Sequence, residues 1–215
     1  MASPTNPGPH LIPRRVAAII VVVALLCACT AMTTSDARSP RYPGAPNIDR
    51  PYTGTVADWP LFFIQHNFST QCFDTQYCSV KYGSVPAEHR EPTSSIASLG
   101  DQYPAVLTGA VRIGIDNFAG PVEIDWKSKD GTPLQTSLDL DEIFKDRLVP
   151  IPPGVTREEI PDRIGIGPTT IVVEVDNRTV NVYTRTRIPM KEEQIPGNRF
   201  SFNNDDLVRV FTRTY

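Results

Sequence analysis

Histidine, serine and clustered carboxylates are the side chains in this sequence that could take part in nucleophilic or acid–base chemistry. His66 stands three residues before Ser69 in an apolar segment, and a histidine that activates a serine is a common nucleophilic pair. The acidic residues cluster in three places, where they could share a proton or bind calcium: Asp139, Asp141 and Glu142; Glu158 and Glu159; and Asp205 and Asp206. Basic residues lie near each cluster, so solvent-facing charges or helix starts are the simpler interpretation. His66 is more simply a histidine at the end of a strand.

Motifs that mark a catalytic or metal site are absent from the sequence. It contains no Gly-x-Ser-x-Gly nucleophile elbow, no His-Glu-x-x-His and no phosphate-binding glycine-rich loop. Gly165-Ile166-Gly167-Pro168 is too short for such a loop, and its proline lacks an N–H donor. We therefore predict a protein that is not an enzyme and that uses no metal or cofactor.

The N-terminal segment has the order of residues that is typical of a secretory signal. Arg14 and Arg15 precede an unbroken apolar run, which small residues follow. The run covers residues 16–26 and has 11 residues. A helix that spans a bilayer needs roughly 20 residues, so we expect a cleaved signal rather than a permanent anchor helix. The arginine pair also suggests a twin-arginine signal, although the residues after it match that motif poorly.

Leu26-Cys27-Ala28-Cys29 resembles the bacterial lipobox, in which a large apolar residue and two small ones precede a cysteine that is lipidated after cleavage. Cys29 is the better acceptor, because cleavage before Cys27 would place Leu26 where a small residue is required. A diacylglyceryl group and an N-acyl chain on Cys29 would together supply the two chains that stable anchoring needs. Thr30, rather than an aspartate, follows and favours the periplasmic face of the outer membrane. The alternative is an ordinary cleaved signal with two incidental cysteines.

The sequence divides into three segments of different composition. We predict a signal peptide in residues 1–28, a flexible tether in residues 29–58 that is rich in Pro, Ser and Thr, and one globular domain in residues 59–215. Removal of residues 1–28 leaves 187 residues with 19 basic and 24 acidic side chains, a net charge of −5. This mildly acidic, mixed composition contains no basic stripe and gives no support to nucleic-acid binding.

Cys72 and Cys78 are the cysteines that remain in the predicted domain. In an oxidising compartment two cysteines at this spacing predict a disulfide. The competing interpretation is a metal site, which needs further ligands, but the nearby histidines His66 and His89 show no recognisable spacing. We expect the disulfide to close a loop, residues 71–77, between two strands.

Alternation of apolar and polar residues predicts a mainly β domain. Tight-turn sequences are present at Lys129-Asp130-Gly131-Thr132 and at Asp176-Asn177-Arg178. A short helix is expected at residues 140–146, capped by Asp139 or Asp141, and one further turn at residues 156–160. Strands are expected at residues 61–68, 78–82, 106–115, 122–126, 134–140, 170–175, 180–186 and 207–214, with polar loops at 88–103 and 190–204. This pattern fits a single-domain antiparallel β-sandwich, or an antiparallel sheet, with one or two short helices.

Residues 60–215 also contain several short segments that together resemble one family of bacterial proteins. The segments are His66-Asn67-Phe68, the Cys72/Cys78 pair, Trp126-Lys127-Ser128-Lys129-Asp130-Gly131-Thr132, Glu142-Ile143-Phe144-Lys145-Asp146, Arg157-Glu158-Glu159-Ile160-Pro161, Asn181-Val182-Tyr183, Pro196-Gly197-Asn198-Arg199 and Asp205-Asp206-Leu207. In these segments the chain resembles lipoproteins that serve as immunity partners of type VI secretion phospholipase effectors. The cover is broad, and no single motif is diagnostic.

The resemblance implies a β-rich periplasmic protein on a lipid tether, with a lipase toxin as its protein partner and the membrane as its anchor. Such a protein blocks the active site of the toxin, or its access to lipid, and so protects the producing cell. The alternative function is that of a structural or assembly lipoprotein that binds other envelope proteins. Gene neighbourhood separates the two, because a lipase gene beside this one favours immunity.

Two segments are candidates for the contact with a partner. The first is the loop at residues 71–77, in which Phe73 and Tyr77 are of a type that binds partners when exposed. The second is the strand at residues 207–214, in which Arg209 and Arg213 face water or an acidic partner. The competing interpretation of the two arginines is that they are ordinary solvent-facing strand residues.

Overall fold

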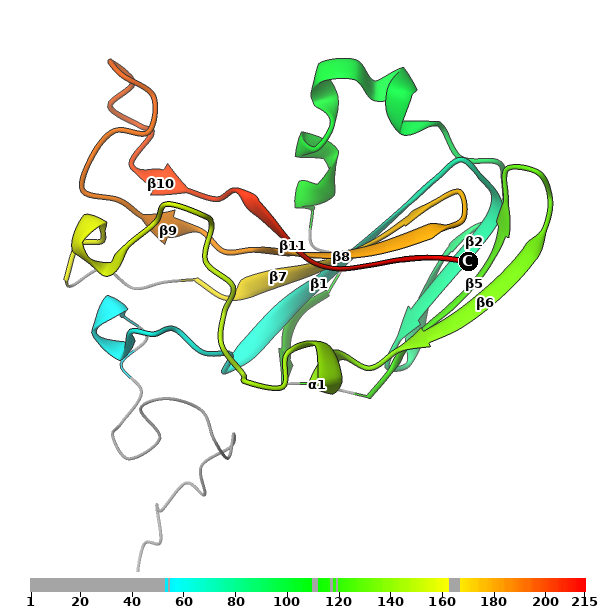
Figure 1. Ribbon diagram of the computed structural model, residues 1–215, viewed down its shortest axis with the longest axis horizontal. Coiled ribbons are helices and arrows are strands. Elements are labelled where there is room, and N and C mark those ends of the chain that lie inside the picture. Colours follow the sequence, from blue (N-terminus) through cyan, green and yellow to red (C-terminus); the bar gives the residue numbers. More distant parts are fainter. Residues whose placement is uncertain (1–52, 54, 110–111, 117, 119, 163–166) are drawn as a thin grey trace, which may run out of the picture. The chain divides into compact units, whose positions relative to one another are not determined.

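A computed structural model describes residues 53, 55–109, 112–116, 118, 120–162 and 167–215 (Figure 1). The predicted signal peptide, the lipobox with Cys27 and Cys29, and most of the predicted tether lie outside these residues. Within the described part of the chain, no helix combines the length and the apolar character that crossing a membrane requires.

The larger sheet has five strands in the order β11-β8-β7-β1-β4. Its strands are β1 (Gln65–Phe73), β4 (Arg112–Asp116), β7 (Thr169–Asp176), β8 (Thr179–Arg185) and β11 (Leu207–Thr214). Neighbouring strands are antiparallel except for β1 and β7, which are parallel along eight residue pairs from His66↔Thr169 to Phe73↔Asp176. A parallel pair needs a long crossover, and here the whole second sheet lies between the two strands in the sequence.

The second sheet has four strands in the order β3-β2-β5-β6, and all its pairs are antiparallel. Its strands are β2 (Thr75–Tyr82), β3 (Val85–His89), β5 (Val122–Ser128) and β6 (Pro133–Leu138). Along β5 the residues alternate strictly between buried and exposed, and Val122, Ile124 and Trp126 face the core. The predicted turn at residues 129–132 and the hairpin that it closes are confirmed.

Short elements complete the fold. They are the strands β9 (Ile188–Pro189) and β10 (Asn203–Asn204), the helix α1 (Leu140–Ile143), and the 3-10 turns η1 (Val56–Asp58), η2 (Ile96–Gln102), η3 (Ala105–Thr108) and η4 (Arg157–Glu159). Helix α1 begins as predicted, because the Asp139 carboxylate accepts the Asp141 N–H at 2.9 Å and caps the helix.

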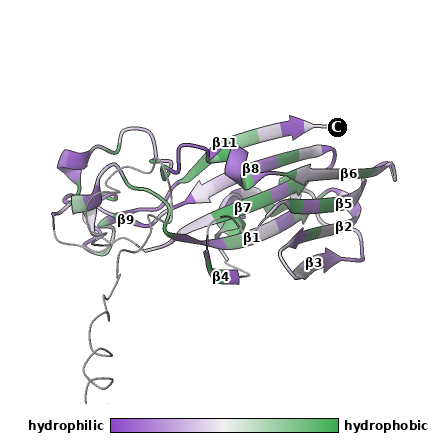
Figure 2. Ribbon diagram, turned by 90° about the horizontal axis from the view of Figure 1, so that it is seen from below, coloured by the Kyte–Doolittle hydropathy of each residue, from purple (hydrophilic) through white to green (hydrophobic). Residues whose placement is uncertain are grey.

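The main hydrophobic core receives side chains from both sheets, and the mainly β, sandwich-like fold class is confirmed. Figure 2 shows the hydrophobic residues concentrated on the strands. Trp126 of β5 reaches across to the β7–β8 turn, where its indole N–H donates to the Asn177 carbonyl at 2.7 Å. Tyr215 packs edge-on against Trp126, with the ring centroids 5.4 Å apart, and its hydroxyl donates to Thr136 Oγ1 at 2.8 Å. These contacts join the two sheets at one end.

The chain passes from the first sheet to the second through a single residue. Strand β1 ends at Phe73, Asp74 adopts φ 49°, and β2 begins at Thr75. Aspartate is one of the few residues other than glycine that enters this left-handed region readily. The predicted loop at residues 71–77 is therefore wrong: its residues belong to two strands and a tight corner. Ser69 and Thr70 are polar but buried, so the sequence of β1 lacks the alternation of apolar and polar residues that would indicate its full length.

The predicted disulfide is present, and it connects Cys72 of β1 to Cys78 of β2 across this corner, with the Cα atoms 6.4 Å apart. Both cysteines are buried in the core that the two sheets share. The covalent link therefore joins the two sheets as well as the two strands.

Further segments differ from the sequence-based expectation. Residues 61–64 precede β1 and are held to the segment after α1 by two backbone bonds, Phe63 N–H to Arg147 O and Val149 N–H to Leu61 O, both 2.9 Å. The side chains of Leu61, Phe62 and Phe63 are thus buried without joining a sheet. The strand expected at residues 106–115 is divided between η3 and β4, and the loop expected at residues 88–103 contains η2.

Replacement of Cys72 and Cys78 tests how much the disulfide across the corner contributes to stability. Cys72→Ala together with Cys78→Ala should lower the free energy of unfolding by about 2 kcal/mol, because the short loop between them gains entropy in the unfolded chain. Urea denaturation of the oxidised protein and of the double variant measures the difference. Reduction of the unchanged protein should reproduce the loss, and equal stability of all three forms would contradict this role.

Candidate binding surface

Phe73 does not present its side chain to solvent. It is 5% exposed and packs with Leu107 and Val172 on the outer face of the five-stranded sheet. The segment that contains η2 and η3 covers this cluster with partly buried residues, among them Tyr103. The expectation that Phe73 is exposed is therefore wrong, because the sequence gives no sign that this segment folds back over the sheet.

Tyr77 lies on the other sheet. It stands opposite Lys127 in the β2–β5 ladder and is half-buried. A shallow depression of about 360 Å³ adjoins it, lined also by Lys127, Pro133 and Gln135. Tyr77 and Phe73 are close in sequence, but the corner at Asp74 places them in different sheets.

Arg209 and Arg213 are both exposed on β11, the edge strand of the larger sheet. A register shift between Arg209 and Phe211 changes the alternation of side chains along the strand. Arg209 stands opposite Tyr183 on the outer face, whereas Arg213 stands opposite Val180, which faces the core. The Arg213 guanidinium lies over the Phe211 ring, 5.4 Å from its centroid. The four predicted contact residues therefore do not form one surface.

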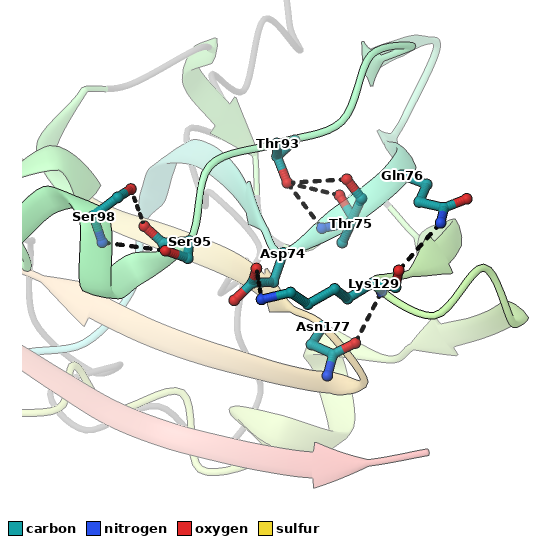
Figure 3. A network of polar contacts seen from close by, with 8 residues as sticks. All are labelled: Asp74, Thr75, Gln76, Thr93, Ser95, Ser98, Lys129 and Asn177. Atoms are coloured by element: carbon teal, nitrogen blue, oxygen red, sulfur yellow. Dashed lines mark hydrogen bonds and ion pairs between the residues drawn. The ribbon is translucent and has the colours of Figure 1, made fainter.

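The turns of both sheets meet at the end of the molecule that contains Asp74, in the polar network of Figure 3. The Lys129 ammonium lies 2.9 Å from the Asp74 carboxylate, and the Lys129 N–H donates to Asn177 Oδ1 at 3.0 Å. Gln76 Nε2 donates to the Lys129 carbonyl at 3.1 Å. On the other side of the corner, Thr75 N–H donates to Thr93 Oγ1 at 3.0 Å. Four turns and loops are thus bonded to one another.

Neighbouring groups shift the pKa values of three charged side chains at this end of the molecule. The hydrogen bond to Asp74 raises the pKa of the Lys129 ammonium, and the Ser128 hydroxyl lowers the pKa of the Asp130 carboxyl to about 2. Burial raises the pKa of Asp176, and the nearby carboxylates of Glu174 and Asp74 add to the effect. The raised pKa of Lys129 and the lowered pKa of Asp130 both favour the charged form of the side chain.

Glu174 is the most buried carboxylate on the outer face of the larger sheet, at 1% exposure. Three donors contact it: Asn181 Nδ2 at 2.8 Å, the Tyr103 hydroxyl at 3.0 Å and the Tyr183 hydroxyl at 3.3 Å. Burial raises the pKa of both tyrosines, so each hydroxyl stays protonated and can donate. Because Tyr103 follows η2, its bond to Glu174 holds the covering segment on the sheet.

The candidate catalytic residues are not brought together. His66 is fully buried, and its Nε2 lies 3.1 Å from the Tyr82 hydroxyl. Ser69 is three residues away on the same strand and therefore faces the opposite side of the sheet. The acidic clusters pair with arginines or cap turns, as in the Asp141–Arg147 and Asp205–Arg185 ion pairs. Among the residues that the structure describes, no three His, Cys, Asp or Glu side chains converge as metal ligands would.

The structure also exposes large apolar side chains in a segment that the sequence suggested was a polar loop. Phe200 is 79% exposed and Ile195 is 59% exposed. Proline, glycine and charged neighbours mask these residues in the sequence.

In comparison with known proteins, no family model, no curated protein and no solved structure matches this chain.

The bond between Tyr103 and Glu174 can be tested by stability. Tyr103→Phe keeps the aromatic packing against Phe73 but removes a hydrogen bond to a carboxylate, and should lower the free energy of unfolding by about 1.5 kcal/mol. Tyr183→Phe removes a longer bond and should cost less. Denaturant unfolding at neutral pH measures both values. Equal stability of Tyr103→Phe and the unchanged protein would show that the bond does not hold the segment.

Proposed function

We propose that this protein is a lipid-anchored binding protein of the bacterial envelope that captures a phospholipase toxin and neutralises it. The toxin is the type of partner that the resemblance to immunity lipoproteins implies. The lipid on Cys29 stations the domain at the membrane, where a phospholipase acts, and so raises the local concentration of the inhibitor. The protein acts by occupying a surface of the toxin.

The network of bonds that fixes the scaffold at its turn end is the structural observation that supports this proposal most strongly. The turns of the two sheets are bonded to each other through Asp74, Lys129 and Asn177, next to a buried disulfide. A surface that is ordered before binding loses little conformational entropy in the complex, which favours tight association. Inhibition by occupancy needs such a surface.

A structural or assembly lipoprotein of the envelope is the second candidate function. The exposed edge of β11 favours it, since an edge strand offers backbone groups to a neighbouring protein. The bulge after Arg209 weighs against it, because bulges discourage the addition of a further strand. We therefore place the inhibitor function first.

Lipidation can be tested in cells. The unchanged chain should incorporate labelled palmitate and fractionate with membranes, and Cys29→Ser should abolish both, because the thiol is the acceptor. Cys27→Ser is the matched control and should leave labelling intact. Palmitate labelling that persists in the Cys29→Ser chain, or processing that is insensitive to globomycin, would contradict the assignment.

The inhibitor function predicts that a phospholipase gene lies beside the gene of this protein, and the phospholipase that it encodes is the partner to test. When this lipase is directed to the periplasm it should be toxic, and co-expression of the protein should restore growth. In solution, the protein at about ten times its Kd should lower lipase activity about tenfold. Absence of a complex and of protection would contradict the inhibitor function. Binding to other envelope proteins instead would favour the second candidate.

A further inference from the structure

Residues 190–204 form an arm that begins after β9, includes β10 and projects from the five-stranded sheet (Figure 1). Three of the four large hydrophobic residues that are exposed in the described part of the chain belong to it: Ile195, Phe200 and Phe202, at 59%, 79% and 39% exposure. The fourth is Ile113 on β4, at 78% exposure. Scattered exposed apolar residues are ordinary on protein surfaces, whereas a group on one projection marks an interaction site.

The root of the arm is fixed to the domain. Ile188 and Met190 are buried with Ile160 in a small hydrophobic cluster. The Lys191 N–H donates to the Glu159 carbonyl at 2.8 Å, and the Met190 N–H donates to the Phe202 carbonyl at 2.9 Å. The arm therefore leaves the domain in a defined direction.

The tip of the arm is ordered by its own hydrogen bonds. Gln194 N–H donates to the Ser201 carbonyl at 2.8 Å, and the Ser201 hydroxyl donates to the Asn198 carbonyl at 2.7 Å. The Phe200 N–H donates to Asn198 Oδ1 at 3.1 Å, and the Gly197 N–H donates to a Glu193 carboxylate oxygen at 2.9 Å. The conformation that displays Phe200 is thus built in before any partner arrives.

This arrangement is unfavourable for an isolated protein and favourable for a complex. A large apolar side chain that is exposed to water does not contribute the favourable free energy of burial. That free energy is gained when a partner buries the side chain. The loop is already ordered, so little of that gain is lost to entropy on binding. Arg199 stands next to Phe200, with its guanidinium 5.0 Å from the ring centroid, and aromatic and arginine side chains dominate binding hot spots.

Charge distinguishes between a protein pocket and a lipid surface. The arm contains two carboxylates, Glu192 and Glu193, and two basic residues, Lys191 and Arg199, so its charges balance. Segments that dock on the anionic lipids of membranes are rich in lysine and arginine, and this segment has no such excess. A concave apolar pocket with a neutral rim is complementary to it.

We propose that the tip, residues 195–202, inserts Phe200 and Ile195 into an apolar pocket of a protein partner. On the proposed function, on which this inference rests, that partner is the phospholipase toxin. An enzyme that binds acyl chains must contain an apolar cleft, and a rigid loop with two or three apolar side chains can fill it. The tip then excludes the lipid substrate by occupying its place.

Affinity for the adjacent-gene phospholipase tests the insertion. Full-length, detergent-solubilised Phe200→Ala should bind the lipase about thirtyfold or more weakly than the unchanged protein, as expected for a buried hot spot. Ile113→Ala is the matched control, since it removes an apolar side chain of nearly equal exposure, and its Kd should stay within about twofold. Both variants should melt at the same temperature as the unchanged protein, because neither side chain is buried.

The position of the tip in the complex is tested by photocrosslinking. With p-benzoylphenylalanine in place of Phe200, illumination of cells should yield an adduct with the lipase at residues that line its apolar cleft. If the unchanged protein and Phe200→Ala bind the lipase equally, the inhibitor function stands and the insertion is wrong. Crosslinks to lipid alone would identify a membrane-docking loop and overturn the proposal. If the unchanged protein forms no complex, both proposals fail.

Discussion

The corner at Asp74 is the constraint on which the rest of the fold depends. Asp74, in a left-handed conformation, is the only residue between strand β1 of the larger sheet and strand β2 of the smaller one. The Cys72–Cys78 disulfide, which is buried in the core, links these two strands across the corner. β1 is an inner strand of the larger sheet and β2 an inner strand of the smaller one, so strands pair with both sides of each. The corner therefore constrains the placement of the strands in both sheets. The Trp126–Asn177 and Tyr215–Thr136 bonds hold the sheets together at the turn end.

A scaffold fixed in this way allows other segments to be presented rather than buried. The segment with η2 and η3 is laid over the larger sheet and held there by the Tyr103–Glu174 bond. The arm at residues 190–204 is rooted in a separate small cluster and leaves the sheet. The covering segment and the root of the arm are held by contacts with residues far away in the sequence, whereas the tip of the arm is ordered by hydrogen bonds among residues 193–201. A binding protein needs contact residues that are both ordered and exposed, because ordered residues lose little conformational entropy on binding.

Much of the fold follows from the sequence, and the exceptions have a common physical cause. Strict alternation in β5 and the turn residues at 129–132 and 176–178 carry local information, so both hairpins were predictable. Strand β1 was misjudged because buried polar residues such as Ser69 break its apolar pattern. Phe73 is buried where the sequence predicts exposure, and Phe200 is exposed in a segment that the sequence predicts to be a polar loop. Burial of the first and exposure of the second depend on tertiary contacts that no local pattern records.

Hydrogen–deuterium exchange across the complex would test most directly whether this is a binding domain that acts through its arm. The phospholipase that the proposed function predicts to be encoded beside this gene is added to the full-length protein, and the exchange of each segment is compared with that of the free protein. Binding through the tip predicts slowed exchange in residues 194–202 and little change in β5, which is already protected in the core. Unchanged exchange in the arm together with protection at the turn end or on β11 would contradict it.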